Sequence, residues 1–210
     1  MLKILIADDH AIVREGLKQI LADTPDMVVA GEAATGNQVM EMIRKQHWDV
    51  VLLDITMPGG NGLDTLKQLK KEKPDLPVLM LSMYPEEQYA IRTIKAGVSG
   101  YLTKESAPKE LITAIRKVAK GGRYISDSLS EKLAAYLGND TDKLPHETLS
   151  DREFQVVIMI ATGKTVSQIA EELSLSVKTI STNRSRALNK MKMKNNSEIT
   201  HYAIKHGLVI

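Results

Sequence analysis

Hydrophobic and polar residues follow two different patterns along this chain, and the patterns divide it into two parts. Over the first 124 residues, short apolar runs bounded by Asp, Gly or Pro alternate with longer stretches in which apolar residues recur every three or four positions. The short runs predict β-strands and the longer stretches predict amphipathic helices. The predicted strands are Lys3–Ala7, Val28–Ala33, Val50–Leu53, Val78–Ser82 and Gly100–Leu102, and the predicted helices are Ile12–Ala22, Gly36–Gln46, Gly62–Lys71, Glu86–Ala96 and Pro108–Lys120.

The alternation of these elements predicts the fold of the first part. Five strand–helix units follow one another, and the strands are nearly unbroken apolar runs, which is typical of parallel strands buried on both faces. We therefore expect residues 1–124 to form an α/β domain with a doubly wound, five-stranded parallel sheet of the flavodoxin-like type.

The second part reads as a linker followed by a small all-α domain. Residues 125–145 are polar and turn-rich, with a short helix predicted at 128–137. From residue 146 to 210 the pattern predicts four helices with tight connections. Ser150 and Thr165 open capping boxes, Ser176 caps a helix over Val177–Met191, and Ser197 is the predicted cap of the fourth helix.

Composition and charge exclude several classes of function for this protein. The chain has no cysteine, which excludes disulfides, thiolate metal sites and thiol nucleophiles. No apolar stretch is long enough to span a bilayer, so we expect a cytoplasmic protein without membrane contact. Residues 149–210 hold nine basic and five acidic residues, whereas the rest of the chain is net negative. This asymmetry indicates a polyanion as partner of the second part, although an unevenly charged solvated surface would give the same count.

Polar residues follow several of the predicted strands directly. Asp8 and Asp9 follow the first strand and Asp54 follows the third. Ligands of open α/β sheets bind beyond the carboxyl ends of the strands, so these carboxylates should converge. Two carboxylates about 4 Å apart repel by roughly 4 kcal/mol at an effective dielectric near 20, and such a cluster needs a cation or a raised pKa. Oxygen ligands of this kind suit Mg²⁺.

The fourth and fifth strands add a hydroxyl and an amine to this edge. Ser82 ends the fourth strand, and Lys104 follows the fifth. A metal and an ammonium that neutralise phosphoryl oxygens while a carboxylate attacks make up a phosphoryl-transfer site. Each residue alone is more simply explained as a polar loop residue of an α/β domain, but the four positions together favour the phosphoryl-transfer interpretation.

Four motifs carry a resemblance to a known family. They are Asp8-Asp9-His10, residues 54–62 (Asp-Ile-Thr-Met-Pro-Gly-Gly-Asn-Gly), Leu81-Ser82, and residues 100–104 (Gly-Tyr-Leu-Thr-Lys). With their spacing, residues 2–122 resemble the receiver domain of two-component response regulators. Glu105 departs from the pattern, because many receivers place proline after the lysine.

The resemblance implies roles for these residues. Asp54 would accept a phosphoryl group from a sensor histidine kinase or a small phosphodonor. Asp9, Asp54 and the backbone carbonyl of Thr56 would hold Mg²⁺, with Asp8 contributing through water. Lys104 would pair with the carboxylate and then with the phosphoryl group. Ser82 would move its hydroxyl to a phosphoryl oxygen and leave space for the switch residue Tyr101, which could otherwise be a half-buried aromatic on an edge strand.

Two further features near this edge receive simpler interpretations. His10 opens the first helix, and we expect it at the rim of the site and not as a metal ligand. Gly59, Gly60 and Gly62 are too few and wrongly spaced for a nucleotide-binding loop, and they predict a turn that frees the phosphorylation loop.

The predicted helix over Val177–Met191 is basic and amphipathic. On a helical wheel Val177, Ile180, Ala187, Leu188 and Met191 form an inward face, and Lys178, Ser181, Thr182, Ser185 and Asn189 form the opposite face. Arg184 falls among the apolar residues and must extend its head group to solvent or find a partner. Six basic residues and no acid lie between Lys178 and Lys194. Such a helix, entered through a three-residue turn, fits the major groove of DNA.

Residues 147–209 resemble the helix-turn-helix domain of the LuxR/NarL type. The resemblance rests on Leu149-Ser-Asp-Arg-Glu153, Gly163, Ile169-Ala-Glu-Glu-Leu173 and Ser176-Val-Lys-Thr-Ile180, and it is nearest to the subgroup containing the GacA, UvrY and BvgA regulators. It implies that the third helix reads DNA and that the fourth dimerises through Ile199, Tyr202 and Ala203. The predicted DNA contacts are Lys178, Ser181, Thr182, Arg184, Ser185, Arg186, Lys190 and Lys192.

Together these features predict a DNA-binding transcription regulator that is not an enzyme, and that phosphorylation of Asp54 switches. We expect Mg²⁺ as cofactor, and as partners a sensor histidine kinase, double-stranded promoter DNA, a second copy in the active state, and RNA polymerase as a further candidate. An Mg²⁺-dependent phosphohydrolase is the main rival, but it would want a second acid at position 56, where Thr56 stands. A receiver whose output domain binds protein or RNA is the other alternative.

Overall fold

The computed structural model describes residues 1–57, 60–83, 86–126 and 144–209. The chain divides into two compact units, Met1–Leu133 and Ala134–Ile210. The short helix predicted at 128–137 lies outside the described residues. Within the described residues, no helix is both long and apolar enough to cross a membrane.

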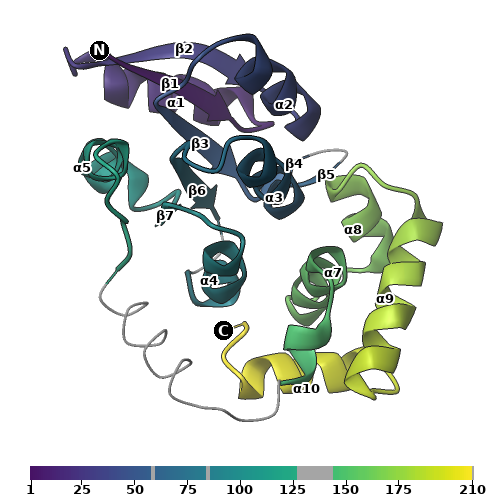
Figure 1. The fold of residues 1–210 in the computed structure, drawn as a ribbon. Helices are drawn as coiled ribbons and strands as arrows, with labels where there is room; N and C mark the ends of the chain where they lie inside the picture. Colours follow the sequence, from purple (N-terminus) through teal and green to yellow (C-terminus); the bar gives the residue numbers. More distant parts are fainter. Residues whose placement is uncertain (58–59, 84–85, 127–143, 210) are drawn as a thin grey trace. The chain divides into compact units, whose positions relative to one another are not determined.

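The first unit is built on a five-stranded parallel sheet (Figure 1). Its strands lie in the order β2-β1-β3-β6-β7, and neighbouring strands are parallel throughout. Their bounds are β1 Leu2–Ala7, β2 Met27–Ala33, β3 Val50–Asp54, β6 Val78–Ser82 and β7 Gly100–Thr103. This order places β1 and β3 side by side, as the doubly wound fold predicted from the sequence requires.

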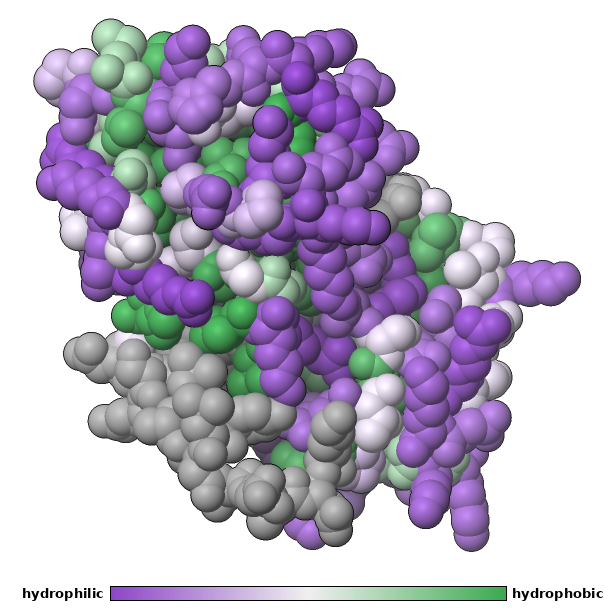
Figure 2. All heavy atoms as spheres, viewed as in Figure 1, coloured by the Kyte–Doolittle hydropathy of each residue, from purple (hydrophilic) through white to green (hydrophobic). Residues whose placement is uncertain are grey.

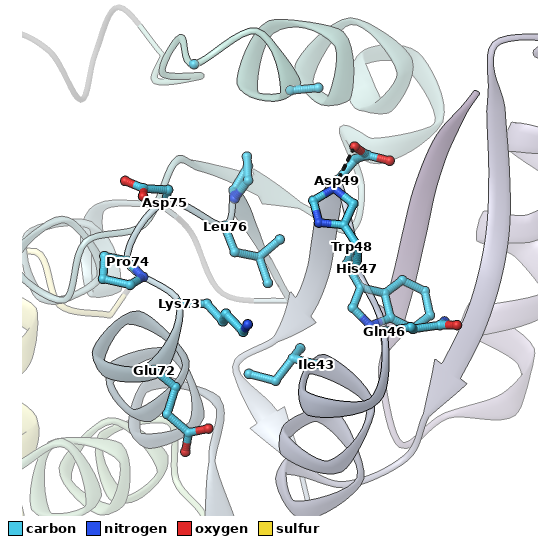
Figure 3. A pocket seen from close by; sticks show the side chains of 13 residues that line it. Ile43, Gln46, His47, Trp48, Asp49, Glu72, Lys73, Pro74, Asp75 and Leu76 are labelled. Atoms are coloured by element: carbon cyan, nitrogen blue, oxygen red, sulfur yellow. Dashed lines mark ion pairs between the residues drawn. The ribbon is translucent and has the colours of Figure 1, made fainter.

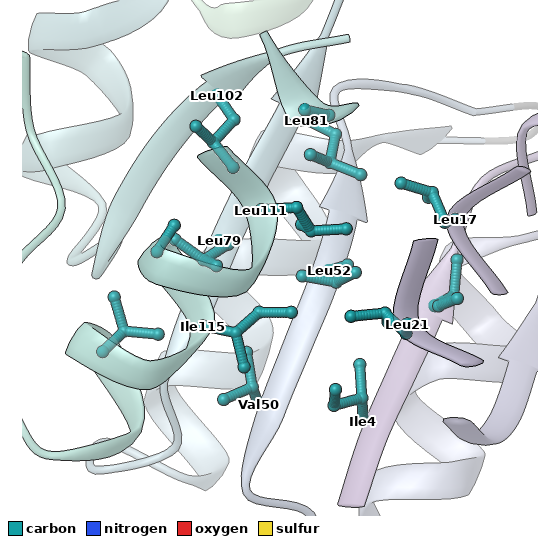
Figure 4. Close-up of a cluster of buried hydrophobic side chains, with 14 of the residues drawn as sticks. Ile4, Leu17, Leu21, Val50, Leu52, Leu79, Leu81, Leu102, Leu111 and Ile115 are labelled. Atoms are coloured by element: carbon teal, nitrogen blue, oxygen red, sulfur yellow. The ribbon is translucent and has the colours of Figure 1, made fainter. Parts of the chain in front are cut away.

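Helices cover both faces of the sheet (Figure 1). Their bounds are α1 Ala11–Ala22, α2 Gly36–Lys45, α3 Gly62–Glu72, α4 Glu86–Lys95 and α5 Ala107–Ala119. Leu17 and Leu21 of α1 and Leu111 and Ile115 of α5 pack on alternate residues of the strands, such as Leu52 (Figure 4). Because strand side chains alternate between faces, the remaining apolar residues of the same strands are free to pack beneath α2 and α3.

A small hairpin after β3 was not predicted from the sequence. Strands β4 (Thr56–Met57) and β5 (Gly60–Asn61) pair antiparallel and lead directly into α3. Gly62 approaches the backbone of Asp54 so closely that an added Cβ would lie 2.0 Å from its carbonyl oxygen. A glycine is therefore needed here so that the chain can return beside Asp54.

The second unit contains four α-helices within the described residues, preceded by a 3₁₀ turn over Pro145–Thr148. The helices are α7 Asp151–Ala161, α8 Val166–Glu172, α9 Val177–Met191 and α10 Asn196–Lys205. Ser150 and Thr165 form the predicted capping boxes, and Ser176 caps α9. The cap predicted for α10 was wrong, because Asn195, and not Ser197, accepts the hydrogen bond from the Glu198 amide.

One residue of the predicted inward face of α9 is exposed. Ile180, Ala187, Leu188 and Met191 are buried as the helical wheel predicted, but Val177 is 51% exposed. Val177 is the first residue of α9, and a helical Cβ tilts toward the amino end, so its side chain extends past the packed turns.

Candidate functional sites

The acidic residues predicted to converge lie together at the carboxyl ends of β1 and β3. Asp8, Asp9, His10 and Asp54 each offer a ligand atom within 4.8 Å of the others. Lys104 joins the cluster from the end of β7, with its Nζ 2.6 Å from an oxygen of Asp8 and 3.0 Å from Oδ2 of Asp54. The Lys104 amide donates to the Ser82 carbonyl at 2.8 Å, which fixes the loop at this edge. Residues far apart in the sequence therefore form one charged cluster.

Burial governs the electrostatics of this cluster. Asp8 is fully buried and Asp54 is 2% exposed. Burial raises the pKa of Asp54 to about 6; Lys104 lowers it and Asp8 raises it further. Burial opposes the charged form of Lys104, but the neighbouring Asp54 and Asp8 outweigh it and raise the pKa of the ammonium. The site thus holds acidic oxygens that a single ammonium neutralises only in part.

The other side chains predicted for this site come from the neighbouring strands β6 and β7. Ser82 ends β6 and is 1% exposed, and Tyr101 lies in β7 and is 3% exposed. Tyr101 is therefore buried and not half-buried. The Thr56 amide donates a hydrogen bond that lowers the pKa of Asp54; the predicted role of the Thr56 carbonyl stays a prediction. Among the described residues every peptide bond is trans, including the one between Lys104 and Glu105.

Two basic side chains of the first helix region contact the acidic loop. His10 is largely exposed at the rim, with Nδ1 2.9 Å from Oδ1 of Asp9. The Arg14 guanidinium donates to the Asp8 carbonyl at 2.8 Å and to Glu32 on β2 at 3.0 Å. Sequence reasoning missed Arg14, because nothing in its spacing shows that it reaches back to the loop before its own helix.

A separate hollow lies at the opposite edge of the sheet (Figure 3). This cavity of about 440 Å³ is lined by residues at the ends of α2, α3 and α5 and before β3 and β6, among them Ile43, Trp48, Asp49 and Leu76. The imidazole of His47 pairs with Asp49 at its margin, 3.4 Å away. Because it lies at the amino ends of the strands, the hollow is distinct from the acidic cluster.

The outer face of α9 carries most of the residues predicted to meet DNA. Hydrophilic side chains dominate the visible surface over α9 and α10 (Figure 2). The exposed residues of the predicted set are Lys178, Ser181, Thr182, Ser185, Arg186, Lys190 and Lys192. Thr182 donates its hydroxyl to the Lys178 carbonyl at 2.9 Å, so its remaining capacity is that of an acceptor.

Two basic residues of α9 have partners inside the second unit. Lys190 lies 2.6 Å from Oε2 of Glu153, whose carboxylate is 4% exposed and also completes the capping box of α7. The Arg184 Nε donates to Oδ1 of Asn196 at the start of α10. Arg184, which the helical wheel placed among apolar residues, thus has a hydrogen-bond partner. Arg184 connects α9 to α10, and Lys190 connects α9 to α7.

The residues expected at the dimer seam need a correction. Ile199 and Ala203 are fully buried in the second unit, whose α10 contacts α7, and they belong to the core. Their spacing of four marks one face of a helix, but it does not say what that face packs against. Tyr202 is partly exposed, with its hydroxyl 2.8 Å from Nδ1 of His146, and the exposed residues around it are His201, Ile204 and Lys205.

A doubly wound domain with an acidic edge and a lysine, followed by a four-helix unit with a helix-turn-helix, defines a two-domain signalling regulator. Comparison with known proteins agrees. Residues 4–116 match the family described as response regulator receiver domain, and residues 147–203 match the bacterial regulatory proteins of the luxR family. The chain belongs to the response regulator family, in its LuxR/NarL type.

Relatives and solved structures span the whole chain. Response regulator UvrY of Escherichia coli is 37% identical over 99% of this chain and 96% of its own length. Response regulator GacA of Pseudomonas aeruginosa is 36% identical over 100% and 98%. RcsB of Salmonella typhimurium superposes with a TM-score of 0.70 at 26% identity, over 100% of this chain and 98% of that chain. RcsB bound to promoter rprA with the phosphomimetic BeF3⁻ gives 0.65 at 28% identity, over 96% and 98%.

Proposed function

We propose that this protein is a transcription regulator in which phosphorylation of Asp54 controls binding of promoter DNA by α9. The observation that carries the proposal is the contact of Lys104 with both Asp8 and Asp54 in a buried acidic cluster. A buried ammonium beside two carboxylates is suited to a site that gains and loses phosphoryl charge. The proposed donor is a sensor histidine kinase or a small acyl phosphate.

The donor set fits Mg²⁺. Asp8, Asp9 and Asp54 present only carboxylate oxygens, which Mg²⁺ prefers, and one ammonium leaves them partly uncompensated. We assign the cation to these three residues and to the Thr56 carbonyl, with His10 at the rim. When bound, Mg²⁺ would supply charge neutralisation for the oxygens of the incoming phosphoryl group.

Side chains of this protein would each have a separate role in the phosphoryl transfer. An oxygen of Asp54 attacks phosphorus and forms the acyl phosphate while the bond from phosphorus to the donor breaks. Lys104, already 3.0 Å from Oδ2 of Asp54, pairs with the new phosphoryl oxygens. Ser82 ends β6 and Tyr101 lies in the adjacent strand β7, and we assign to them the hydroxyl that binds the phosphoryl group and the aromatic that responds to its movement.

The second unit would bind the DNA. Helix α9 presents exposed Ser181 and Ser185 for base edges and exposed Arg186 and Lys192 for phosphates. RcsB has been solved on DNA, and one such structure holds two RcsB dimers on two parallel DNAs. By analogy we assign to this chain double-stranded promoter DNA as ligand and a homodimer as the binding form; RNA polymerase is a further partner that we propose because it acts at promoters.

Phosphorylation of the purified chain tests the proposal. The protein is incubated with Mg²⁺ and acetyl phosphate, and the phosphorylated residue is located by mass spectrometry. Phosphate should appear on Asp54 and disappear in Asp54→Asn or after removal of the metal. Asp75→Asn, which changes an exposed acid remote from the cluster, should be phosphorylated like the wild type. Phosphate that persists on Asp54→Asn would overturn the assignment.

A further inference from the structure

An apolar side chain is exposed at the amino end of α9. Val177 is 51% exposed, although the other apolar residues of the helical wheel are buried. The next exposed residues predicted to meet DNA along α9 are Lys178 and Ser181. In a helix-turn-helix domain the first residues of the recognition helix reach the base edges, and the Cβ of Val177 tilts toward that end.

The hydroxyls around Val177 already have partners. Ser176 accepts from the Thr179 amide at 3.0 Å, and the two hydroxyls lie 2.8 Å apart. The first turn of α9 therefore offers a base edge an apolar surface flanked by one lysine. Valine is β-branched with a restricted χ1, so it loses little rotamer freedom when a partner covers it.

We propose that Val177 is a specificity-determining residue that contacts the 5-methyl group of a thymine in the major groove. Thymine is the only base that presents a methyl group there. The inference rests on the proposed binding of DNA by α9 and adds a preference that Ser181 and Ser185 cannot supply through hydrogen bonds alone. Covering one methyl group is worth about fourfold in affinity per contact.

Selection from random-sequence duplexes tests the contact and requires no defined operator. One library contains thymidine, and a matched library contains deoxyuridine, which lacks only the methyl group. Each is bound to the full chain in the presence of Mg²⁺ and beryllofluoride, and the retained fragments are sequenced. The variants are Val177→Ala, which keeps helix propensity, and Val177→Ile, which keeps the apolar contact. Val28→Ala is the matched control, since it removes the same methyl groups from a valine that is 37% exposed on β2 of the first unit.

The wild type should enrich a motif with one thymine position per half-site whose preference falls about fourfold in the deoxyuridine library. Val177→Ala should show no difference between libraries at that position, whereas Val177→Ile and Val28→Ala should behave like the wild type. If Val177→Ala keeps the wild-type difference, or no position distinguishes the libraries, the contact is wrong while DNA binding stands. If no motif is enriched at all, DNA binding and the contact both fail.

Discussion

The acidic cluster of the first unit is buried and already paired, whereas the outer face of α9 is exposed and carries few partners. Lys104 and Asp54, which are 50 positions apart in the chain, meet 3.0 Å apart between strand ends. Ser181, Ser185 and Arg186 lie close together in the chain and all face solvent. In the first region, the charges that would perform the chemistry are buried and depend on one another for neutralisation. In the second, the packing of α9 depends on other residues.

Substitutions should therefore have different effects in the two regions. A change in the acidic cluster affects stability and function together, because it leaves a buried charge without its partner. A change on the outer face of α9 should affect DNA binding alone. Lys190 and Arg184 are exceptions on α9, because they pair with Glu153 and Asn196 inside the second unit. Substitutions of these two residues should therefore affect stability as well.

Lys104→Gln should give the largest effect. It leaves Asp8 and Asp54 buried side by side, which should cost about 3 kcal/mol of unfolding free energy at neutral pH without metal. Mg²⁺ should restore part of this loss, because it replaces the missing positive charge. Urea unfolding followed by the fluorescence of Trp48, the one tryptophan of the sequence, measures the free energy of unfolding. Lys120→Gln, at an exposed position, is the control. A variant as stable as the wild type without metal would contradict the pairing.

Glu153→Gln should give the next largest effect. Burial works against the Glu153 carboxylate, but the Lys190 ammonium and Ser150 outweigh it and hold the pKa below its usual value. Glutamine keeps the capping geometry but loses the charge, at a cost of about 1.5 kcal/mol at pH 7. The stabilisation by a depressed carboxyl pKa is present above the unfolded value near 4.3 and is lost as pH falls through the folded value.

Thermal melts followed by circular dichroism check this pH dependence. The gap between wild type and Glu153→Gln should be full at pH 7 and should close under acid, below about pH 4. Glu172→Gln is the matched control, because Glu172 pairs with Lys164 at the surface, where such a pair contributes little. A gap that stays constant into acid would show that the charge of Glu153 does not stabilise the unit.

Ser185→Ala should change specificity without changing stability. Ser185 is exposed on the side of α9 that we propose faces the bases, so its loss should lower the preference for operator over unrelated DNA by about 1 kcal/mol. Thr182→Ala should cost less, because the Thr182 hydroxyl already donates to the Lys178 carbonyl. Binding titrations on operator and scrambled duplexes measure the ratio. An unchanged ratio for Ser185→Ala would refute its assignment to a base edge.

Arg186→Gln should give the smallest effect and the same effect on every sequence. Losing one phosphate contact should reduce the log–log salt slope by about 0.9 for each subunit of the dimer, which is about 3.5-fold in affinity per subunit between 50 and 200 mM salt. Lys190→Gln should in addition lower the melting temperature, because Lys190 pairs with buried Glu153. Salt titrations and melts of both variants separate the two roles. If Arg186→Gln lowers stability and Lys190→Gln does not, the roles are reversed.

The first region could be predicted from the sequence almost completely. Parallel strands end at one edge, so the residues after each strand identify the members of the cluster whatever the packing between the layers. The contact of Arg14 with the Asp8 carbonyl could not be found in this way, since it depends on the direction of one long side chain.

The second region was less predictable for a physical reason. A helical wheel gives directions around an axis, but it does not give the partner on each side. Val177 was expected inside and is exposed, and Ile199 and Ala203 were expected at a dimer seam and lie in the core. Asn195 and Ser197 are both good caps, so the sequence alone did not decide where α10 begins.

The central claim is that the charge state of Asp54 controls DNA binding by α9, and one measurement tests it directly. The affinity for a selected operator and the association state are measured with Mg²⁺, with and without beryllofluoride, for the wild type and Asp54→Asn. Beryllofluoride should increase the wild-type affinity on the order of tenfold and favour the DNA-bound dimer, and Asp54→Asn should not respond. Equal affinity and equal association state of the wild type with and without beryllofluoride would contradict it.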